Sequence, residues 1–437
     1  MRNRSILVVG IALMCSVGIS PLSAQQRADT LSKARKDSIA AADSLRLIRE
    51  FEQLQQGSAR KGGDSTAPAA AVKGTGPTNP RLMPDISAVG DIIFDASPNG
   101  STLSDPSKRA DIREVEIAIQ AAVDPYFRGD IFLGFSDDEK VSIEQAFLTT
   151  TELPAQIEMK IGRYLMPVGK VNLTHRHDLH TIDYPWVVQR FLGGEGLKGT
   201  GLWANRVFAP FGFYQELNVT AVDRFGERDE SLVTAEPLNK QLSGLAYSAR
   251  LRNYWDLGQA TNLEVSGSVM TGVREQPVVP EDAAGVNAVG VRQTLVGGDL
   301  TLRWRPLQQG LYRSFILQIE IMQQVNEQPA TLPVGTEYLG PTRSAVGGYA
   351  FARYQVGPRT FVGARYDAVE TTYPGDANDL RGASGYLEFF PSEFSKLLFG
   401  AERIFQGGLE SGFETDAVTR LQLQAVFALG PHKPHPF

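Results

Sequence analysis

The sequence is poor in cysteine and in long apolar runs. Cys15 is its single cysteine, and it lies in a segment that we expect to be cleaved off, so the mature chain can form no disulfide and no thiolate metal site. Beyond the first two dozen residues, no stretch approaches the roughly 18 to 20 apolar residues of a transmembrane helix. The formal net charge is −6, which argues against a nucleic-acid partner. A large soluble β protein or a transmembrane β-barrel remains, because the alternating strands of a barrel escape a hydropathy average.

The N-terminal part of the chain predicts export followed by a segment outside the main fold. Residues 1–24 have the basic start and short apolar run of a secretory signal peptide. Residues 25–57 carry apolar side chains at imperfect helical spacing, which indicates a helical or coiled-coil segment, with a solvated helix or disorder as the alternative. Residues 58–84 are rich in glycine, proline and serine, so we predict a flexible linker.

Residues 85–437 consist of short alternating segments, joined in turn by a short and a long connection. Asp124-Pro125-Tyr126 is typical of the short turns. Short turns at one rim and long loops at the other are expected of an outer-membrane barrel, and an even strand count returns both ends to one side. We predict sixteen strands, at residues 86–95, 112–123, 127–136, 140–151, 155–164, 198–207, 212–222, 240–252, 259–272, 292–304, 313–326, 344–355, 359–369, 381–390, 395–405 and 417–429.

Alternation within the strands predicts one apolar and one polar face. Val115 and Ile117 alternate with Glu114 and Glu116, so the two pairs lie on opposite faces of the sheet. A soluble sandwich would show the same alternation. Strands near 10 residues long, aromatic residues near strand ends and the terminal Phe437 favour an all-β transmembrane antiparallel barrel of about 16 strands. We therefore expect a bacterial outer-membrane protein whose N-terminal helix and C-terminus are periplasmic.

If the apolar face meets lipid, the polar face lines the lumen. Charges of both signs would then surround a water-filled, weakly selective pore. The alternative is that most of them form salt bridges that only stiffen the barrel. The predicted pore-lining residues are Arg128, Lys160, Arg250, Arg252, Arg303, Arg365 and Arg420, with Glu114, Glu116, Asp130, Glu144, Glu158, Glu264, Asp299, Glu320, Asp367, Glu388 and Glu402.

The strand and turn from Ile161 to Lys170, with Gly162-Arg163-Tyr164 followed by Pro167-Val168-Gly169, resemble a junction of the phosphate-selective porin family. The order of signal, helical segment and about sixteen strands also resembles that family. The resemblance implies that the third long loop, residues 165–197, folds into the lumen as a constriction, and that the protein is a homotrimer. The surplus of acids in the inferred lumen argues against specific phosphate uptake. The predicted constriction charges are Lys170, Arg176, Asp178, Asp183 and Arg190, with solvated loop charge as the alternative.

The five histidines form two clusters that could bind a metal. Their spacing can present two or three imidazoles to zinc or nickel, and a polar loop with incidental histidines is the alternative. We expect no other cofactor. The candidate metal ligands are His175, His177 and His180 in the third loop and His432 and His435 in the tail.

We expect the chain to be a porin for passive diffusion of small polar or ionic solutes, embedded in outer-membrane lipid. One alternative is a metal-linked outer-membrane protein that uses the histidine clusters. Another is a membrane tether, in which the barrel anchors the coiled coil. No spacing links Ser142 or Ser248 to a histidine and an acid, so the sequence does not indicate an enzyme.

Overall fold

The structure is a computed structural model that describes residues 84–136, 141–226, 242–280, 287–326, 336–338, 344–370, 379–406 and 418–430. The predicted signal peptide, helical segment and nearly all of the predicted linker lie outside the described residues, and so do the candidate ligands His432 and His435. All the described residues belong to one compact unit, residues 77–437.

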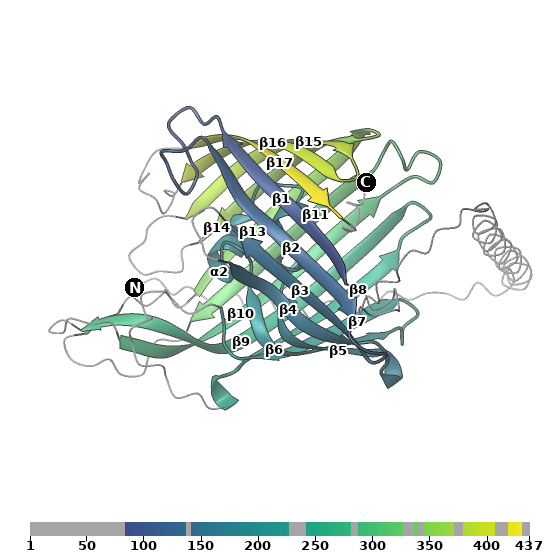
Figure 1. The fold of residues 1–437 in the computed structure, drawn as a ribbon, viewed down its shortest axis with the longest axis vertical. Coiled ribbons are helices and arrows are strands. Elements are labelled where there is room, and N and C mark those ends of the chain that lie inside the picture. Colours follow the sequence, from purple (N-terminus) through teal and green to yellow (C-terminus); the bar gives the residue numbers. More distant parts are fainter. Residues whose placement is uncertain are drawn as a thin grey trace, which may run out of the picture. The chain divides into compact units, whose positions relative to one another are not determined.

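The described residues form strands joined by turns, with one short α-helix and four 3₁₀ turns (Figure 1). The strands are β1 (Asp85–Asp95), β2 (Ala110–Ala122), β3 (Phe127–Phe135), β4 (Ser142–Thr150), β5 (Ile157–Leu165), β6 (Lys198–Phe208), β7 (Tyr214–Val222), β8 (Ala246–Asp256), β9 (Thr261–Pro280), β10 (Asn287–Trp304), β11 (Phe315–Asn326), β12 (Thr336–Tyr338), β13 (Ser344–Gly357), β14 (Thr360–Val369), β15 (Leu380–Ser392), β16 (Ser395–Gln406) and β17 (Thr419–Leu429). The helices are α2 (Trp186–Leu192), η2 (Pro154–Gln156), η3 (Val171–Leu173), η4 (Arg176–Asp178) and η6 (Leu242–Gly244).

The strands close into a single antiparallel barrel. Apart from β12, each strand pairs with the next along the chain, and β1 pairs with both β2 and β17, which closes the ring. β12 pairs only with the far end of β9, while β11 pairs directly with β13, so the ring contains sixteen strands. The predicted closed barrel of about 16 strands is therefore confirmed.

Three predicted strand boundaries on the long-loop side were wrong. The strand expected from residue 240 begins at Ala246, after the 3₁₀ turn η6. β9 and β10 extend beyond their predicted ends as a paired hairpin, with Asn287 opposite Val278. Backbone hydrogen bonds hold this hairpin together and do not require apolar alternation, which explains why its sequence looked like a loop.

The barrel has one rim of short turns and one of long connections. Two residues separate β13 from β14 and two separate β15 from β16, whereas the connection from β5 to β6 spans residues 166–197. The two ends of the described barrel meet at the short-turn rim, because Ala88 near the start of β1 pairs with Leu429 at the end of β17. Among the residues that the structure describes, no helix is long and apolar enough to cross a membrane.

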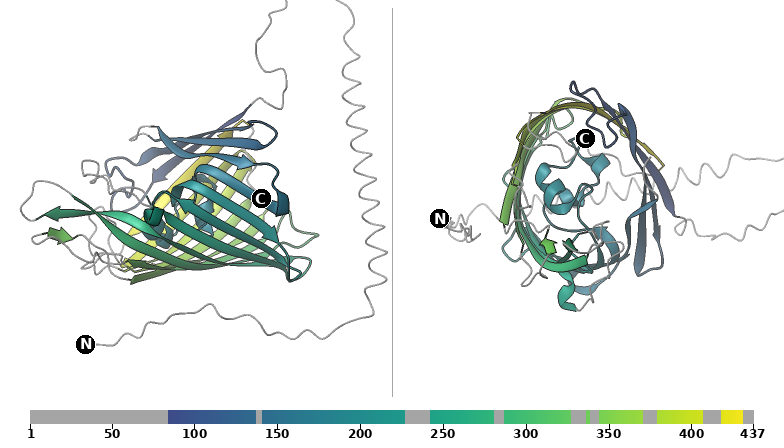
Figure 2. Two further views of the ribbon diagram at one scale, coloured as in Figure 1. Left: turned by 90° about the horizontal axis from the view of Figure 1, so that it is seen from below. Right: turned by 90° about the vertical axis from the view of Figure 1, so that its left-hand side faces the viewer.

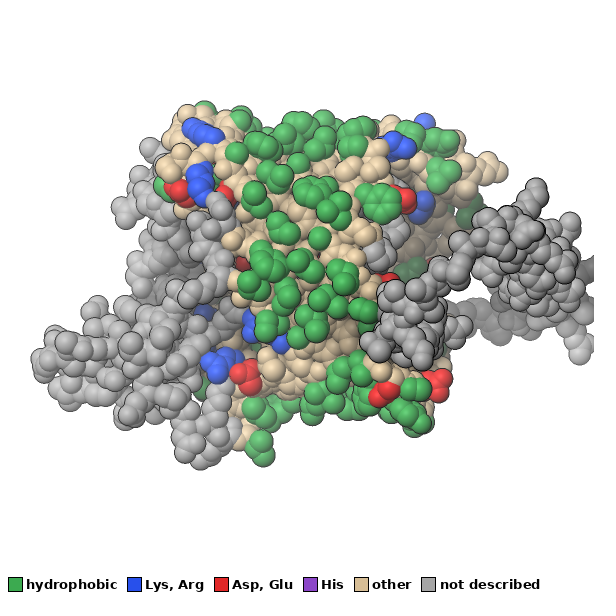
Figure 3. Space-filling view, in the orientation of Figure 1, with side chains coloured by type: hydrophobic (Ala, Val, Ile, Leu, Met, Phe, Trp, Pro, Cys, Tyr) green, Lys and Arg blue, Asp and Glu red, His purple; other side chains and the backbone are tan. Residues whose placement is uncertain are grey.

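The outer face of the barrel is apolar. Branched and aromatic side chains alternate along the strands and point outward, where Figure 3 shows them spread across the face that contains β1 to β4. An exposed apolar surface on this scale marks contact with lipid or with another protein. The exposed strand residues include Ile86, Phe94, Ile112, Ile131, Ile143, Leu148, Ile161, Leu202, Leu217, Val219, Leu251, Val269, Val296, Ile321, Val346, Val362, Leu387, Phe399, Leu421 and Phe427.

Two β-bulges change which side chains face inward. In β1 the adjacent residues Asp91 and Ile92 pair with Glu114 and Ile112 of β2. Arg113, between these two partners, is therefore an extra residue in β2. In the same way, two adjacent residues of β3 pair with Ile143 and Gln145 of β4, and Glu144 between them is the extra residue. A bulge interrupts the regular alternation of faces, so neighbouring polar side chains can both point into the barrel.

The interior contains a hydrophobic layer near the long-loop rim, which we call the apolar layer. It surrounds α2, which lies inside the ring of strands (Figure 2). Pro185 precedes α2, and Gly193, with φ 110°, ends it. The apolar layer comprises Val222, Ala246, Met270, Leu295, Met322, Ala345, Val369, Leu380, Ile404 and Val418 from the wall and Trp186, Val187, Val188, Phe191 and Leu192 from α2.

Candidate functional site

Residues 165–197, the inner loop, enter the barrel from the long-loop rim and run deep into it. Their deepest anchor is Lys396, the second residue of β16 after a short turn. Its ammonium group donates hydrogen bonds to the backbone carbonyls of His177 and of Leu179, the latter over 2.7 Å. Because Lys396 lies near the short-turn rim, the inner loop spans most of the depth of the barrel.

The first turn of the inner loop fits closely against the wall. Gly169 has φ 69°, and its N–H donates to the hydroxyl of Ser268 over 3.2 Å. A Cβ atom at Gly169 would lie only 1.9 Å from a carboxylate oxygen of Glu320. Both its conformation and its surroundings therefore require glycine.

Lys170, the next residue, contacts the wall through both its backbone and its side chain. Its backbone N–H donates to Glu320 over 2.9 Å, and its ammonium group donates to Glu264 over 2.5 Å. Arg252 and Arg303 also contact the Glu264 carboxylate, at 2.9 and 3.4 Å. With Arg250 at 3.9 Å, four cations surround one buried carboxylate, and the predicted constriction residue Lys170 is one of them.

Asp183 joins the inner loop to β2 and β14. The Arg113 guanidinium lies 2.9 Å from Asp183 and 2.6 Å from Asp91, and Arg365 donates to the backbone carbonyl of Asp183 over 2.8 Å. Burial by itself would raise the pKa of the Asp183 carboxyl, but the nearby guanidinium of Arg113 holds the pKa below its ordinary value. Asp183 is therefore ionised and paired at neutral pH.

Trp186 fixes the start of α2. Its backbone N–H donates to Asp367 over 3.0 Å, and its indole N–H donates to Glu402 over 3.1 Å. The Arg420 guanidinium lies 5.1 Å from the centre of the Trp186 ring. The inner loop is thus attached to the wall on several sides, through backbone and side-chain contacts.

The predicted pore-lining charges face the interior, mostly as ion pairs. Arg250 lies 3.1 Å from Asp299, and Arg365 lies 2.6 Å from Asp367. We call this inward-facing set, nearer the short-turn rim than the apolar layer, the charged belt. Its further contacts join Arg128 to Asp130, Arg420 to Glu402, Lys198 to Glu144, Arg353 to Glu388 and Tyr349 to Glu320, while Lys160 lies over Trp203.

Two of the five predicted constriction residues pair with charged groups of the barrel wall. Lys170 and Asp183 pair with the wall, and Arg176 lies 3.1 Å from Glu195. Asp178 lies 3.7 Å from His177. Arg190 lies on α2 and is half-buried. Lys170 and Asp183 therefore help to hold the loop inside the barrel.

Two of the predicted metal ligands come together with a third residue. Ligand atoms of Glu116, His175 and His177 all lie within 4.8 Å of one another. Burial lowers the pKa of His177 to about 4. Burial would also lower the pKa of His175, but the Glu116 carboxylate raises it above the usual value.

His180 lies apart from this three-residue cluster. Its Nδ1 atom is 3.1 Å from Glu388, and burial lowers its pKa although that carboxylate opposes the effect. The histidine pattern therefore identified two members of the cluster, but it did not identify Glu116 as the third.

The described interior retains open space on the short-turn side. A cavity of about 380 Å³ lies between the inner loop and β10, β11, β13 and β14. Lys170, Arg303, Arg353 and Arg365 line it together with Asp178, and aromatic side chains complete its wall.

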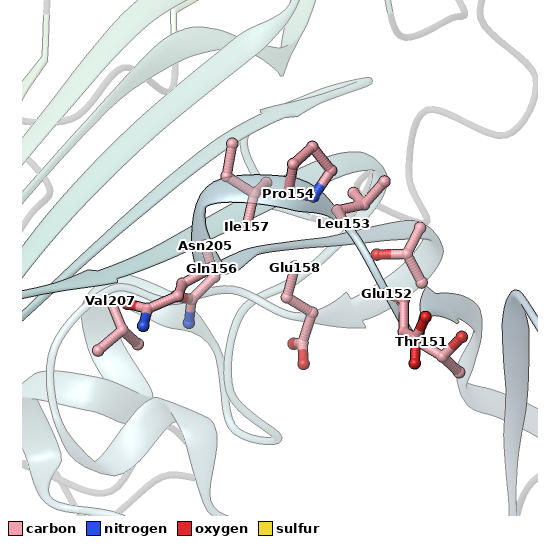
Figure 4. A pocket seen from close by; sticks show the side chains of 10 residues that line it. Thr151, Glu152, Leu153, Pro154, Gln156, Ile157, Glu158, Asn205 and Val207 are labelled. Carbon is pink, nitrogen blue, oxygen red and sulfur yellow. The ribbon is translucent and has the colours of Figure 1, made fainter.

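A second, broader hollow of about 730 Å³ lies at the short-turn rim. Glu158, the remaining predicted acid on β5, and Asn205 on β6 line it (Figure 4). The predicted acid Glu114 instead lines a cavity of about 20 Å³ beside His175. Polar side chains thus border each of these spaces.

Arg113 and Lys396 hold the inner loop but were absent from the predicted site. The bulge in β2 brings Arg113 inward, and no rule of strict alternation could anticipate it. Lys396 has the expected inward phase, but no signal in the sequence marks it as the partner of a distant loop.

The fold is shared with solved outer-membrane proteins. The sequence matches no family model. OprB of Pseudomonas putida is similar in structure, with a TM-score of 0.52 at 10% identity over 79% of this chain and 94% of that one. The chain has a porin-like fold. At this identity the similarity concerns the fold alone.

Other similarities are weaker or uninformative about function. The outer-membrane channel DcaP of Acinetobacter baumannii gives a TM-score of 0.49 at 13% identity, over 79% of this chain and 98% of that one. A protein of Aquifex aeolicus (strain VF5), described as uncharacterized, is 28% identical over 340 residues, which cover 74% of this chain and 69% of that one. Neither similarity bears on which solute passes.

Proposed function

We propose that this protein is an outer-membrane channel through which small polar or ionic solutes diffuse passively, with the inner loop as its constriction. The observation that carries the proposal is the division of the barrel into an apolar outer face and a charged interior. Lipid can cover the outer face, and a closed barrel leaves no strand edge unpaired within a bilayer. The cavity beside Lys170 would form part of the solute path.

The mixture of charges argues for weak ion selectivity. Most cations of the charged belt have a carboxylate partner within hydrogen-bond distance, as Arg250 has Asp299 and Arg365 has Asp367. Paired charges largely cancel at a distance, whereas a ring of one sign would select strongly. The resemblance to phosphate-selective porins therefore does not extend, in this proposal, to phosphate specificity.

A closed barrel that serves as a membrane anchor is the second candidate. The apolar layer favours it, because α2 and the wall pack together across the lumen near the long-loop rim. In that case the predicted coiled coil would act as the tether, and the barrel would anchor it in the membrane. In either case we propose that the short-turn rim and both chain ends face the periplasm, and that the barrel assembles as a homotrimer.

Single-channel recording in planar lipid bilayers separates the two candidates. For the purified full chain, the channel proposal expects stepwise conductance and a reversal potential near zero in a salt gradient. Absence of steps, in a preparation that resists unfolding by detergent at room temperature, would overturn the channel and favour the anchor. A strongly anion-selective current would overturn the weak selectivity while leaving the channel intact.

A further inference from the structure

Glu116, His175 and His177 form a compact cluster that solute diffusion does not require. Glu116 comes from the middle of β2, while the two histidines come from the inner loop around η4. The Nδ1 atom of His175 is 2.8 Å from a Glu116 carboxylate oxygen, and the two imidazole rings stack with their centres 5.5 Å apart. Side chains from two distant segments thus present three ligand atoms to one point.

The donor set is one that divalent transition metals prefer. Two imidazole nitrogens and one carboxylate oxygen can supply three ligands to zinc, and a water can complete a tetrahedral site. The cavity of about 20 Å³ beside His175 has room for about one water molecule. The cluster therefore has both the chemistry and the adjacent space for such an ion.

The surroundings hold the ligands in place. The Gln145 amide is 2.7 Å from the Nε2 atom of His175, and its oxygen accepts the N–H of Leu165 over 3.1 Å. The Phe132 ring lies 5.3 Å from that of His175, and Lys396 holds the backbone at His177. When an ion occupies Nδ1 of His175, the ring proton lies on Nε2, so the Gln145 amide must turn its oxygen from the Leu165 N–H to accept it, as carbonyl acceptors do beside metal-bound histidines.

The cluster is buried but remains accessible. Glu116 is 3% exposed and His177 is 2% exposed, whereas the side chain of His175 is 20% exposed. Glu144 and Asp178 lie nearby, and the cations Arg176, Lys198 and Lys396 balance these two acids and Glu116. A divalent cation can therefore enter from the side of His175, and its stabilisation comes from the three ligands themselves.

We propose that Glu116, His175 and His177 bind one divalent transition-metal ion of the zinc type, with water as a further ligand. The ion replaces the direct contact between His175 and Glu116. It joins the inner loop to β2, a wall strand that the apolar layer does not include. This proposal is independent of solute passage and holds for a channel or an anchor.

Calorimetric titration of the metal-stripped protein in detergent with zinc tests the proposal. The protein must carry no histidine tag, and a background with His432→Gln and His435→Gln removes the tail as a source of ligands. We expect one zinc ion per chain in this background. Replacing His175 or His177 with glutamine should weaken binding about 100-fold or more, since even outer-shell changes cost about 10- to 100-fold.

His180→Gln is the matched control, because His180 lies in the same loop but contacts Glu388 instead of the cluster. It should bind zinc as tightly as the background does. Cobalt gives a second measurement: its visible absorption should show nitrogen and oxygen ligation, and this signal should be lost in Glu116→Gln and His177→Gln. Before these measurements, each variant should be tested for its resistance to unfolding by detergent at room temperature, which shows that it is folded.

Two results would overturn the proposal. One is no zinc binding in the background that keeps all three loop histidines. The other is equal loss of affinity in His180→Gln and His177→Gln, which would mean that the loop binds metal without a defined site. Because neither measurement uses conductance, failure of the metal site and failure of the channel are distinguishable.

Discussion

The apolar layer and the charged belt hold the same inner loop by different forces. In the apolar layer, α2 lies among buried apolar side chains of the wall and packs mainly against β11, β13 and β14. In the charged belt, Lys170, Asp183 and the backbone at His177 contact specific wall groups. Hydrophobic packing depends on buried area and tolerates small shifts, whereas hydrogen-bonded charges fix one geometry. The apolar layer thus supplies closure, and the charged belt sets where the loop lies.

Phe191→Ala should have the largest effect, because it removes a side chain that is 2% exposed from the apolar layer. Loss of a buried phenylalanine typically costs about 3–5 kcal/mol. Trypsin cleavage after Arg176 and Arg190 within the loop should therefore accelerate about 100-fold or more. Phe399→Ala is the control, since Phe399 points outward and is 48% exposed. Equal cleavage of the two variants would mean that the apolar layer does not retain the loop.

Gly169→Ala should have the next largest effect, and it acts mainly on the charged belt, since the added Cβ atom would lie 1.9 Å from Glu320 and 2.6 Å from Met322 of the apolar layer. The left-handed conformation and the overlap with Glu320 together should cost about 2–4 kcal/mol. The loop should become more sensitive to trypsin near Lys170 while α2 stays protected. Gly194→Ala is the control, because a Cβ atom there meets nothing within 4 Å. Loss of protection at both places would show that the two layers act as one unit.

The barrel was predictable because its signals are local. Alternation places Ile117 and Glu116 on opposite faces whatever the rest of the chain does, and Asp124-Pro125-Tyr126 forms a turn by itself. The same holds for the inward phase of Glu264 and Asp299. The sixteen strands and most of their inward charges follow from such patterns.

The partners of the inner loop could not be predicted in this way. Asp183 meets Arg113 across 70 positions, and His180 meets Glu388 across 208. Such pairs depend on how the loop lies in the finished barrel. The bulge at Arg113 adds a local departure from alternation. The resemblance to a porin family suggested that the loop enters the lumen, but it named none of these contacts.

Asp183→Asn should have the smallest effect and can separate the two layers by pH. The Asp183 carboxyl has a pKa below the ordinary 3.8 in the folded protein, so its ionised form stabilises the docked loop above that pH. This contribution is lost as the pH falls through the lower, folded-state pKa. At neutral pH the substitution should destabilise the docked loop by about 1 kcal/mol, a value discounted because the side chain is 32% exposed.

Hydrogen exchange of the peptide containing Trp186, corrected for intrinsic rates, should therefore be faster in the Asp183→Asn variant at neutral pH and equal to wild type in strong acid. Asp105→Asn, in an exposed turn beside Ser107, should match wild type throughout. A variant that differed from wild type equally at every pH would place the effect of Asp183 in packing instead of charge.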